Sequence, residues 1–359
     1  MMRLIRGTRP AIIFGALFLC TGNSHGADIG GKISTTLTIT EDSQLVDDVT
    51  CTVTGAACIA IGASHVTLDL NGFTMTGQGD AQAGCNGTST GGESGINVTN
   101  QKSVLIRGPG LVQQFRSHGV LLNGGGGSRI TELTISTNCM SGIFLSGSSD
   151  NQIDANVSVR NGHMVNPCGG ICLAGAARNR IRANRVSGNG YVAAGNNFGI
   201  GLVTATVTGN LIEENTAVGN ANGFYLVAGV QGNIFRRNFL GGNPPVQVAV
   251  DHTANGGFDI KNQAEAGKNL FEDNFCLTSV NAPCPAVSSN PTSFLESQLQ
   301  YVACGNYPPV PSCRLNAYQW NWYLINKINQ AAQVLVIEDG SQLMTARQYI
   351  QARNGAGLF

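Results

Sequence analysis

Charged and aromatic residues are both scarce in this chain of 359 residues, at 12% and 6% of the sequence. The formal net charge is zero, and no basic stripe with interleaved aromatic residues occurs, which argues against a nucleic-acid partner. The low aromatic content weakens the case for a groove that stacks sugar rings, although an acidic polysaccharide can be held by charge alone. The low charge and the 48 glycines suit a protein of strands and turns better than a helical enzyme.

A hydrophobic run long enough to cross a membrane is also missing. The apolar run Ala11 to Leu19 has nine residues, whereas a membrane-spanning helix needs about 20. Three arginines precede this run and small residues follow it, as in a secretory signal peptide. We therefore expect an exported protein, either secreted or periplasmic, without a membrane span.

Paired CxxC or HxxH spacings are missing too, so we predict neither a metal site nor another cofactor. One of the 11 cysteines lies in the predicted signal, which leaves 11 − 1 = 10, an even number typical of disulfides in an exported chain. No partner is predicted for Cys85 or Cys172. Three candidate pairs are close in sequence and a fourth could bridge adjacent repeats: Cys51 with Cys58, Cys276 with Cys284, Cys304 with Cys313, and Cys139 with Cys168.

The clearest feature that is present is a pattern that occurs four times between Gly142 and Asn243. Each copy reads G-[IF]-x-L, then N-x-[IF]-x-x-N, then a further Asn. Weaker copies extend this array in both directions, and repeats of this length decide the fold of a chain. Eight repeats start at Ile59, Ile96, Val120, Ile143, Ile171, Ile200, Phe224 and Phe258.

Each repeat contains two or three short runs in which apolar side chains alternate with others, separated by Gly and Asn. Such alternation indicates strands, and Gly and Asn indicate turns. The Leu-rich consensus of leucine-rich repeats and the helical spacing of TPR or ankyrin repeats are absent. The predicted fold is all-β, a right-handed single-stranded parallel β-helix solenoid of about eight coils, with a rise of ~4.8 Å per coil.

When the repeats are stacked, their Asn residues form columns. Asn tolerates the left-handed backbone of a tight turn, and its amide can bond to the Asn one coil away. We therefore expect internal amide ladders instead of ligand-binding residues, and we expect a preceding Gly column to mark a turn with little room for a Cβ. The two Asn columns are Asn151, Asn179, Asn210, Asn233, Asn269 and Asn71, Asn156, Asn184, Asn215, Asn238, Asn274.

These coils, together with the run Val66 to Gly77, resemble secreted right-handed parallel β-helix proteins of the pectate-lyase-like superfold over about residues 50–277. That group includes pectate lyases, polygalacturonases, alginate epimerases and lyases, NosD-type periplasmic proteins, and members without known activity. The resemblance therefore implies a fold and not one activity. The signature segments of its polygalacturonases, alginate epimerases and pectate lyases are missing, so no catalytic residue is carried over from them.

The sequence divides into four predicted segments. Residues 1–26 form the signal peptide, 27–57 an N-terminal cap, 58–277 the β-helix and 278–359 a C-terminal cap or tail. The last segment carries Trp320 and Trp322, so a separate sugar-stacking module is the alternative there, and a short helix is expected from Gln342 to Arg353. We expect a monomer.

One column of the stacked repeats carries charges of alternating sign. Opposite charges one coil apart indicate a cross-strand ladder. The alternative is a cleft of acidic and basic groups for a polyuronate, in which no single arginine stands out. The column reads Asp69, Arg107, Thr131, Asp154, Arg182, Glu213, Arg236, Glu272.

Four long insertions follow the third Asn position and leave the rod along one edge, at residues 77–93, 162–168, 190–197 and 241–256. Insertions on a common edge often build the binding surface of a repeat protein. Ordinary polar loop residues are the alternative reading, and His65 and His118 in the regular coils are expected to be structural. The candidate acid–base groups are Asp251, His252 and His163, and the candidate substrate contacts are Tyr191, Asp80 and Glu93.

Two functions from different classes remain open. The first is a secreted β-helix that binds or acts on an acidic polysaccharide through this edge, as a polysaccharide lyase or glycoside hydrolase if it is an enzyme. The second is a non-catalytic extracellular or cell-surface scaffold that presents loops to a partner.

Overall fold

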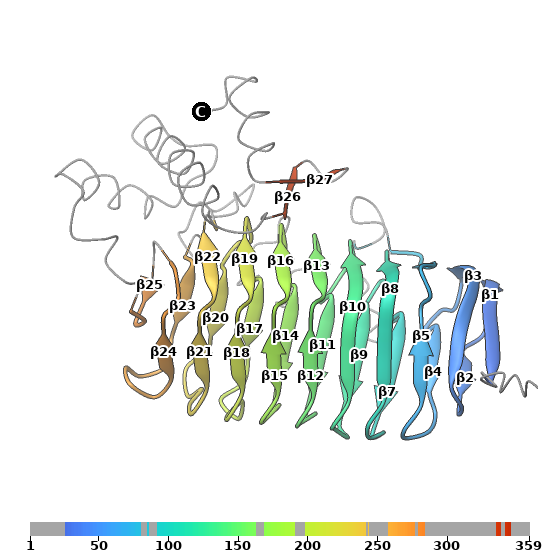
Figure 1. The fold of residues 1–359 in the computed structure, drawn as a ribbon, viewed down its shortest axis with the longest axis horizontal. Helices are drawn as coiled ribbons and strands as arrows, with labels where there is room; N and C mark the ends of the chain where they lie inside the picture. The colour runs from blue at the N-terminus through green and yellow to red at the C-terminus, as the bar shows by residue number, and fades with distance from the viewer. Residues whose placement is uncertain are drawn as a thin grey trace, which may run out of the picture.

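The computed structural model describes residues 26–79, 85, 92–162, 169–190, 198–241, 243, 258–276 and 279–283, and strands at 335–338 and 342–345. In Figure 1 the coils lie side by side along one axis, from the blue N-terminal coil to the orange one, and make an elongated rod. The strands run in parallel and each pairs with its equivalent in the next coil. This confirms the predicted parallel β-helix.

One wall of the rod is a ten-stranded parallel sheet, called sheet B here. Each coil contributes one strand of two to four residues to it. In spatial order these strands are β2 (Leu37–Ile39), β4 (Ile59–Ile61), β7 (Ile96–Thr99), β9 (Val120–Asn123), β11 (Ile143–Ser146), β14 (Ile171–Ala174), β17 (Ile200–Leu202), β20 (Phe224–Leu226), β23 (Ile260–Asn262) and β25 (Ser279–Val280).

The remaining wall is a fifteen-stranded parallel sheet, called sheet A here, which bends so that half of the coils contribute two strands to it. Its first strands in each coil are β1 (Ala27–Ile33), β3 (Ser43–Cys51), β5 (Thr67–Asp69), β8 (Leu105–Gln113), β10 (Arg129–Ser136), β12 (Gln152–Asp154), β15 (Arg180–Arg182), β18 (Leu211–Glu213), β21 (Ile234–Arg236) and β24 (Leu270–Glu272). Its second strands are β6 (Thr74–Thr76), β13 (Val157–Val159), β16 (Arg185–Ser187), β19 (Thr216–Val218) and β22 (Phe239–Gly241).

The rod is filled by the alternating apolar side chains that the sequence marks. Ile143, Ile171 and Ile200 are paired one above another in sheet B, and each is fully buried. Ile153, Ile181 and Ile212 form the equivalent buried stack in sheet A. Because side chains alternate between the two faces of a strand, the residues between them point outward and are free to form a surface.

The predicted amide ladders are confirmed, and a third one lies beside them. In the first two ladders each Asn Nδ2 donates to the Oδ1 of the Asn one coil later, as between Asn184 and Asn215 at 3.0 Å. The third ladder runs from Asn138 through Asn161, Asn189 and Asn220 to Asn243. Its last amide donates to Asp259, whose carboxylate replaces the next Asn.

The prediction that the column Asn residues adopt the left-handed backbone was wrong, although their predicted side-chain bonds are present. The left-handed residue is the one before the Asn, such as Ala155, Ala183 and Glu214 with φ of 57°, 53° and 56°. The Asn side chain instead bonds the backbone that this kink exposes, and Asn184 Nδ2 donates to the Ile153 carbonyl. Asn71 is itself left-handed and exposed, so it does not belong to the second ladder.

The glycine column leaves no room for a side chain, as expected. A Cβ on Gly142 would overlap Ser158 Oγ and lie 2.8 Å from the Gly170 carbonyl oxygen. The last repeat departs from this column. Ile260, not Phe258, pairs with Phe224, so the predicted start of that repeat was wrong by two residues and Asp259 takes the glycine position.

The ends of the described chain show two further features. The segment predicted as an N-terminal cap contains β1, β2 and β3, which pair in parallel with the following strands. Near the C-terminus, β26 (Leu335–Glu338) pairs antiparallel with β27 (Gln342–Thr345). The helix predicted to begin at Gln342 is therefore wrong over residues 342–345.

Candidate functional site

The four insertions leave the rod at one corner of the coil, which we call the insertion edge. Each lies after the second sheet A strand of its coil and before the next sheet B strand, between β6 and β7, β13 and β14, β16 and β17, and β22 and β23. The same corner is formed in other coils by residues 52–58, 114–119 and 137–142. Segments far apart in sequence are thus stacked along this edge (Figure 1).

Glu93 is the one predicted site residue whose surroundings the structure describes. It precedes β7 at the insertion edge, and its side chain is 6% exposed. Asp80, His163, Tyr191, Asp251 and His252 lie outside the described residues, so their proximity to one another stays a prediction.

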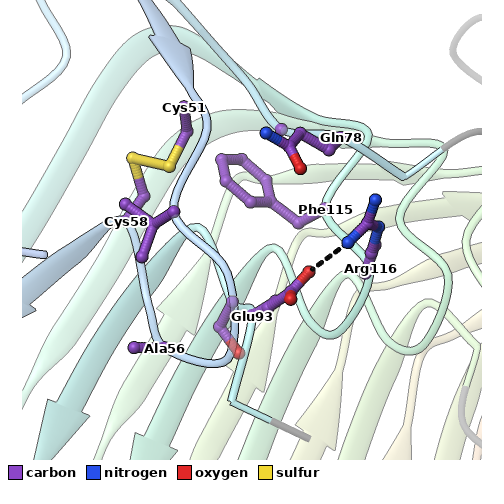
Figure 2. A pocket seen from close by; sticks show the side chains of 10 residues that line it. Cys51, Ala56, Cys58, Gln78, Glu93, Phe115 and Arg116 are labelled. Atoms are coloured by element: carbon purple, nitrogen blue, oxygen red, sulfur yellow. Dashed lines mark hydrogen bonds and ion pairs between the residues drawn. A yellow bond between two sulfur atoms is a disulfide. The ribbon is translucent and has the colours of Figure 1, made fainter. Parts of the chain in front are cut away.

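The Glu93 carboxylate is held by two neighbouring coils. Its Oε1 accepts a hydrogen bond of 2.8 Å from the Gly55 backbone N–H, and its Oε2 accepts one of 3.3 Å from Arg116 Nη1. Figure 2 shows the Glu93 and Arg116 side chains pointing toward each other across a small hollow. Because Arg116 is 31% exposed and Glu93 only 6%, the guanidinium is the charge that faces solvent.

We call this hollow the notch; its lining includes Gln78, Glu93, Ser94, Phe115 and Arg116, beside the disulfide of Cys51 and Cys58 (Figure 2). It has room for about one water molecule. Ser94 Oγ is buried and has no hydrogen-bond partner among the described residues. A buried hydroxyl without a hydrogen-bond partner costs about 1–3 kcal/mol of stability.

The outer face of sheet B begins next to the notch and carries apolar side chains. Leu121 and Phe144 point outward from β9 and β11 and are half-buried. His118 packs against Phe144 with ring centroids 4.6 Å apart, and its Nδ1 accepts the Ser141 N–H. Burial lowers the pKa of His118 to about 3, so the ring is neutral at physiological pH, as a structural histidine should be.

Farther along this face a second apolar cluster lies outside the rod. Phe198 stacks on Tyr225 at 5.3 Å, and Cys172 is buried with them. Lys261 Nζ lies 5.7 Å from the Tyr225 ring centroid, a cation–π distance. Burial lowers the pKa of Lys261 and raises the pKa of Tyr225.

Two disulfides whose cysteines both lie among the described residues join parts of the insertion edge. Cys51 with Cys58 confirms a predicted pair. The predicted pair of Cys139 with Cys168 is wrong, because Cys139 is bonded to Cys85. Cys85 lies within the first insertion, so this bond joins that insertion to the corner two coils later; spacing alone could not reveal it.

The alternating charge column forms ion pairs, as the ladder reading predicted. Glu213 is 1% exposed and contacts Arg180 at 2.7 Å, Arg236 at 2.9 Å and Arg237 at 3.0 Å. Burial acts to raise the pKa of Glu213, but hydrogen bonds from Arg180 and Arg236 outweigh it and leave the pKa lowered. One pairing differs from the expected one, since Asp154 bonds Arg129 of the preceding coil instead of Arg182.

Sequence reasoning missed Arg116, Ser94 and Gln78. A signal for Arg116 was present, because Glu93 and Arg116 lie two and three residues before Gly95 and Gly119 of the glycine column. Stacking these glycines places opposite charges one coil apart. Within the described ranges, no group of three or more His, Cys, Asp or Glu is arranged to hold a metal ion. Over those same residues the structure has no helix that is long and apolar enough to cross a membrane.

Comparison with solved structures finds similar chains of low sequence identity. The Dettilon tailspike protein gp208 has a TM-score of 0.48 and 18% identity, covering 69% of this chain and 55% of that one. The enzymatically active domain of tailspike protein 2 from bacteriophage CBA120 has a TM-score of 0.45 and 13% identity, covering 70% and 38%. A mutant of the periplasmic alginate epimerase AlgG has a TM-score of 0.38 and 13% identity, covering 68% and 62%.

These matches span only part of each relative's length. A search of curated proteins finds no match. The model of the right-handed β-helix region matches residues 36–191 and 94–275, which together cover most of the chain. This match agrees with the parallel sheets, the buried isoleucine stacks and the amide ladders. The chain therefore belongs to the right-handed β-helix family.

Proposed function

We propose that this protein is exported and binds an acidic polysaccharide along the insertion edge and the adjoining outer face of sheet B. The observation that carries the proposal is the notch, where a buried carboxylate holds a solvent-facing guanidinium beside a buried hydroxyl without a partner among the described residues. Half-buried Leu121 and Phe144 lie on the sheet face that starts at this edge. A protein that binds a sugar acid needs a positive charge for the carboxylate, hydrogen-bonding groups for the hydroxyls and an apolar surface for the sugar ring.

The charges on sheet A support a different role for that face. Arg107 with Asp69 and Arg129 with Asp154 on sheet A, and Arg178 with Asp150 in the turns just before it, are close pairs, at 2.7, 2.8 and 2.7 Å. Each of these arginines contacts its carboxylate through both Nε and Nη2, so a polyanion must compete with the resident carboxylate for both donors and is attracted weakly. The charge ladder therefore supports stability, and the insertion edge is the better binding surface.

The disulfides support an exported location. The bonds Cys51–Cys58 and Cys85–Cys139 are of the kind that persists in oxidising compartments outside the cytosol. A chain held in this way along its binding edge suits a secreted, periplasmic or surface-exposed protein.

Cleavage of the polysaccharide is the further step of this proposal, and it depends on Asp251, His252 and His163. Glu93 already bonds Gly55 and Arg116, so it is a poor general base. A non-catalytic binding scaffold is the competing function. It is favoured by the fact that the described lining of the notch holds one carboxylate, whereas glycoside hydrolysis usually needs a pair.

A combined binding and digestion screen separates these possibilities. The mature protein is tested on polygalacturonate, alginate and neutral dextran by affinity electrophoresis, with ultraviolet absorbance and reducing ends followed in parallel. We expect retardation by the acidic polymers and not by dextran. New absorbance that an Asp251→Ala/His252→Ala variant loses identifies a lyase, and reducing ends without absorbance identify a hydrolase. Equal mobility of the folded protein in all gels contradicts the proposal.

A further inference from the structure

We infer that Arg116 recognises the free carboxylate of a uronate residue and that Glu93 positions it. This inference rests on the proposed polysaccharide-binding function and adds to it the form of sugar selected and the residue that selects it.

The first step is the fixed position of Glu93. Its side chain is almost fully buried, and the 2.8 Å bond from the Gly55 N–H anchors one oxygen to the preceding coil. The other oxygen therefore meets Arg116 from the interior side of the notch. A ligand that approaches from solvent meets the guanidinium before it meets the carboxylate.

The second step is the incomplete use of the Arg116 donors. A guanidinium has five N–H donors in a planar fork, and the bond to Glu93 uses one nitrogen at the long distance of 3.3 Å. By contrast, Arg178 donates through both Nε and Nη2 to Asp150, at 2.8 and 2.7 Å. Arg116 thus keeps the paired donors that bind a carboxylate in bidentate fashion.

The third step is the size and polarity of the notch. Room for about one water molecule admits one oxygen atom of a carboxylate or a hydroxyl group, and not a whole sugar ring. The Gln78 side chain lies in the lining and can bond a hydroxyl of the same sugar residue. The sugar ring then stays above the notch while one carboxylate oxygen enters beside Arg116, so a methyl ester, which is larger and uncharged, fits worse.

The test compares free and esterified forms of one polymer. Polygalacturonate and highly methyl-esterified pectin are titrated against wild-type protein, Arg116→Gln, Arg116→Lys and Glu93→Gln. Arg178→Gln is the matched control, since it removes the same charge from the turn between β14 and β15. Thermal unfolding shows that each variant is folded.

We expect the wild type to prefer the free polymer by about 10- to 100-fold, as for hydrogen bonds to a charged group. Arg116→Gln should lose this preference, Arg116→Lys should keep part of it, and Arg178→Gln should keep all of it. Glu93→Gln should lower the preference while binding of the esterified polymer stays unchanged, which a merely structural role of Glu93 does not predict.

Other outcomes separate the two proposals. Equal binding of both polymers by the wild type overturns carboxylate recognition but leaves polysaccharide binding intact. A preference that survives in Arg116→Gln overturns the role of Arg116. Binding of neither polymer, nor of any other polysaccharide tested, overturns the proposed function and this inference with it.

Discussion

At the scale of single residues, the role of a polar side chain follows from the partners that its coil supplies. Glu213 and Glu93 are both buried carboxylates paired with arginine, yet Glu213 contacts several guanidinium groups and Glu93 contacts one, that of Arg116, among the described residues. The arginines around Glu213 form an ion-pair network with it. The single bond from Arg116 to Glu93 leaves other N–H donors of Arg116 without a partner among the described residues. His118 is a third case, because burial keeps it uncharged inside the fold.

The low pKa of His118 predicts a specific dependence of stability on pH. The folded state holds this ring neutral down to about pH 3, whereas the unfolded chain takes up a proton near pH 6.5. The contribution to stability is complete above pH 6.5 and is lost as pH falls from there toward 3. Near pH 5 the loss should be about 2 kcal/mol, at about 1.4 kcal/mol per pKa unit.

The substitution His118→Asn tests this point, since an amide oxygen can still accept the Ser141 N–H. Urea unfolding at pH 7 and pH 5 should give a smaller difference in unfolding free energy for the variant than for the wild type. The same difference in both proteins would show that His118 does not control this part of the pH profile.

At the scale of elements, each ladder Asn acts as a connector between coils. Asn184 Nδ2 donates to Asn215 Oδ1 in the next coil and to the Ile153 carbonyl in the preceding one. Its Oδ1 accepts hydrogen bonds from the backbone N–H and from the Nδ2 of Asn156. Removing this side chain leaves several buried polar groups without partners at once. In a solenoid each coil contacts only its neighbours, so contacts between adjacent coils contribute much of the stability of the whole array.

We therefore expect Asn184→Ala to lower the free energy of unfolding by about 2–5 kcal/mol. Asn123→Ala is the matched control, because Asn123 is exposed at the end of β9 and should change stability by less than about 0.5 kcal/mol. Urea denaturation of both variants measures the difference. Similar small losses in the two would mean that the ladder contributes little.

The sequence alone predicted the strands that recur in each coil. It did not predict features that depart from the repeat or that join different coils. The predicted strand starts from Ile59 to Phe224 agree with the structure, because each coil has an apolar residue at the equivalent buried position. The last coil was misplaced, since Gly257-Phe258 imitates the motif while Asp259 occupies the structural position. The Cys85–Cys139 bond and the Glu93–Arg116 pair join segments whose proximity depends on the stacking of coils.

At the scale of the whole molecule, the rod has two unlike surfaces. The outer face of sheet A carries charges that neutralise one another from coil to coil. The insertion edge carries disulfides, the notch and the start of an apolar sheet face. This asymmetry is the main reason to assign binding to one side of the rod.

Hydrogen–deuterium exchange with and without polygalacturonate tests that assignment most directly. We expect slower exchange in bound protein over residues 92–97 and 114–119, which form the notch and the start of its sheet B strand. Exchange over residues 178–183 and 211–216, at the charge ladder, should not change. Protection of the charge ladder with an unaffected insertion edge would contradict the account, because it would place the ligand on the outer face of sheet A.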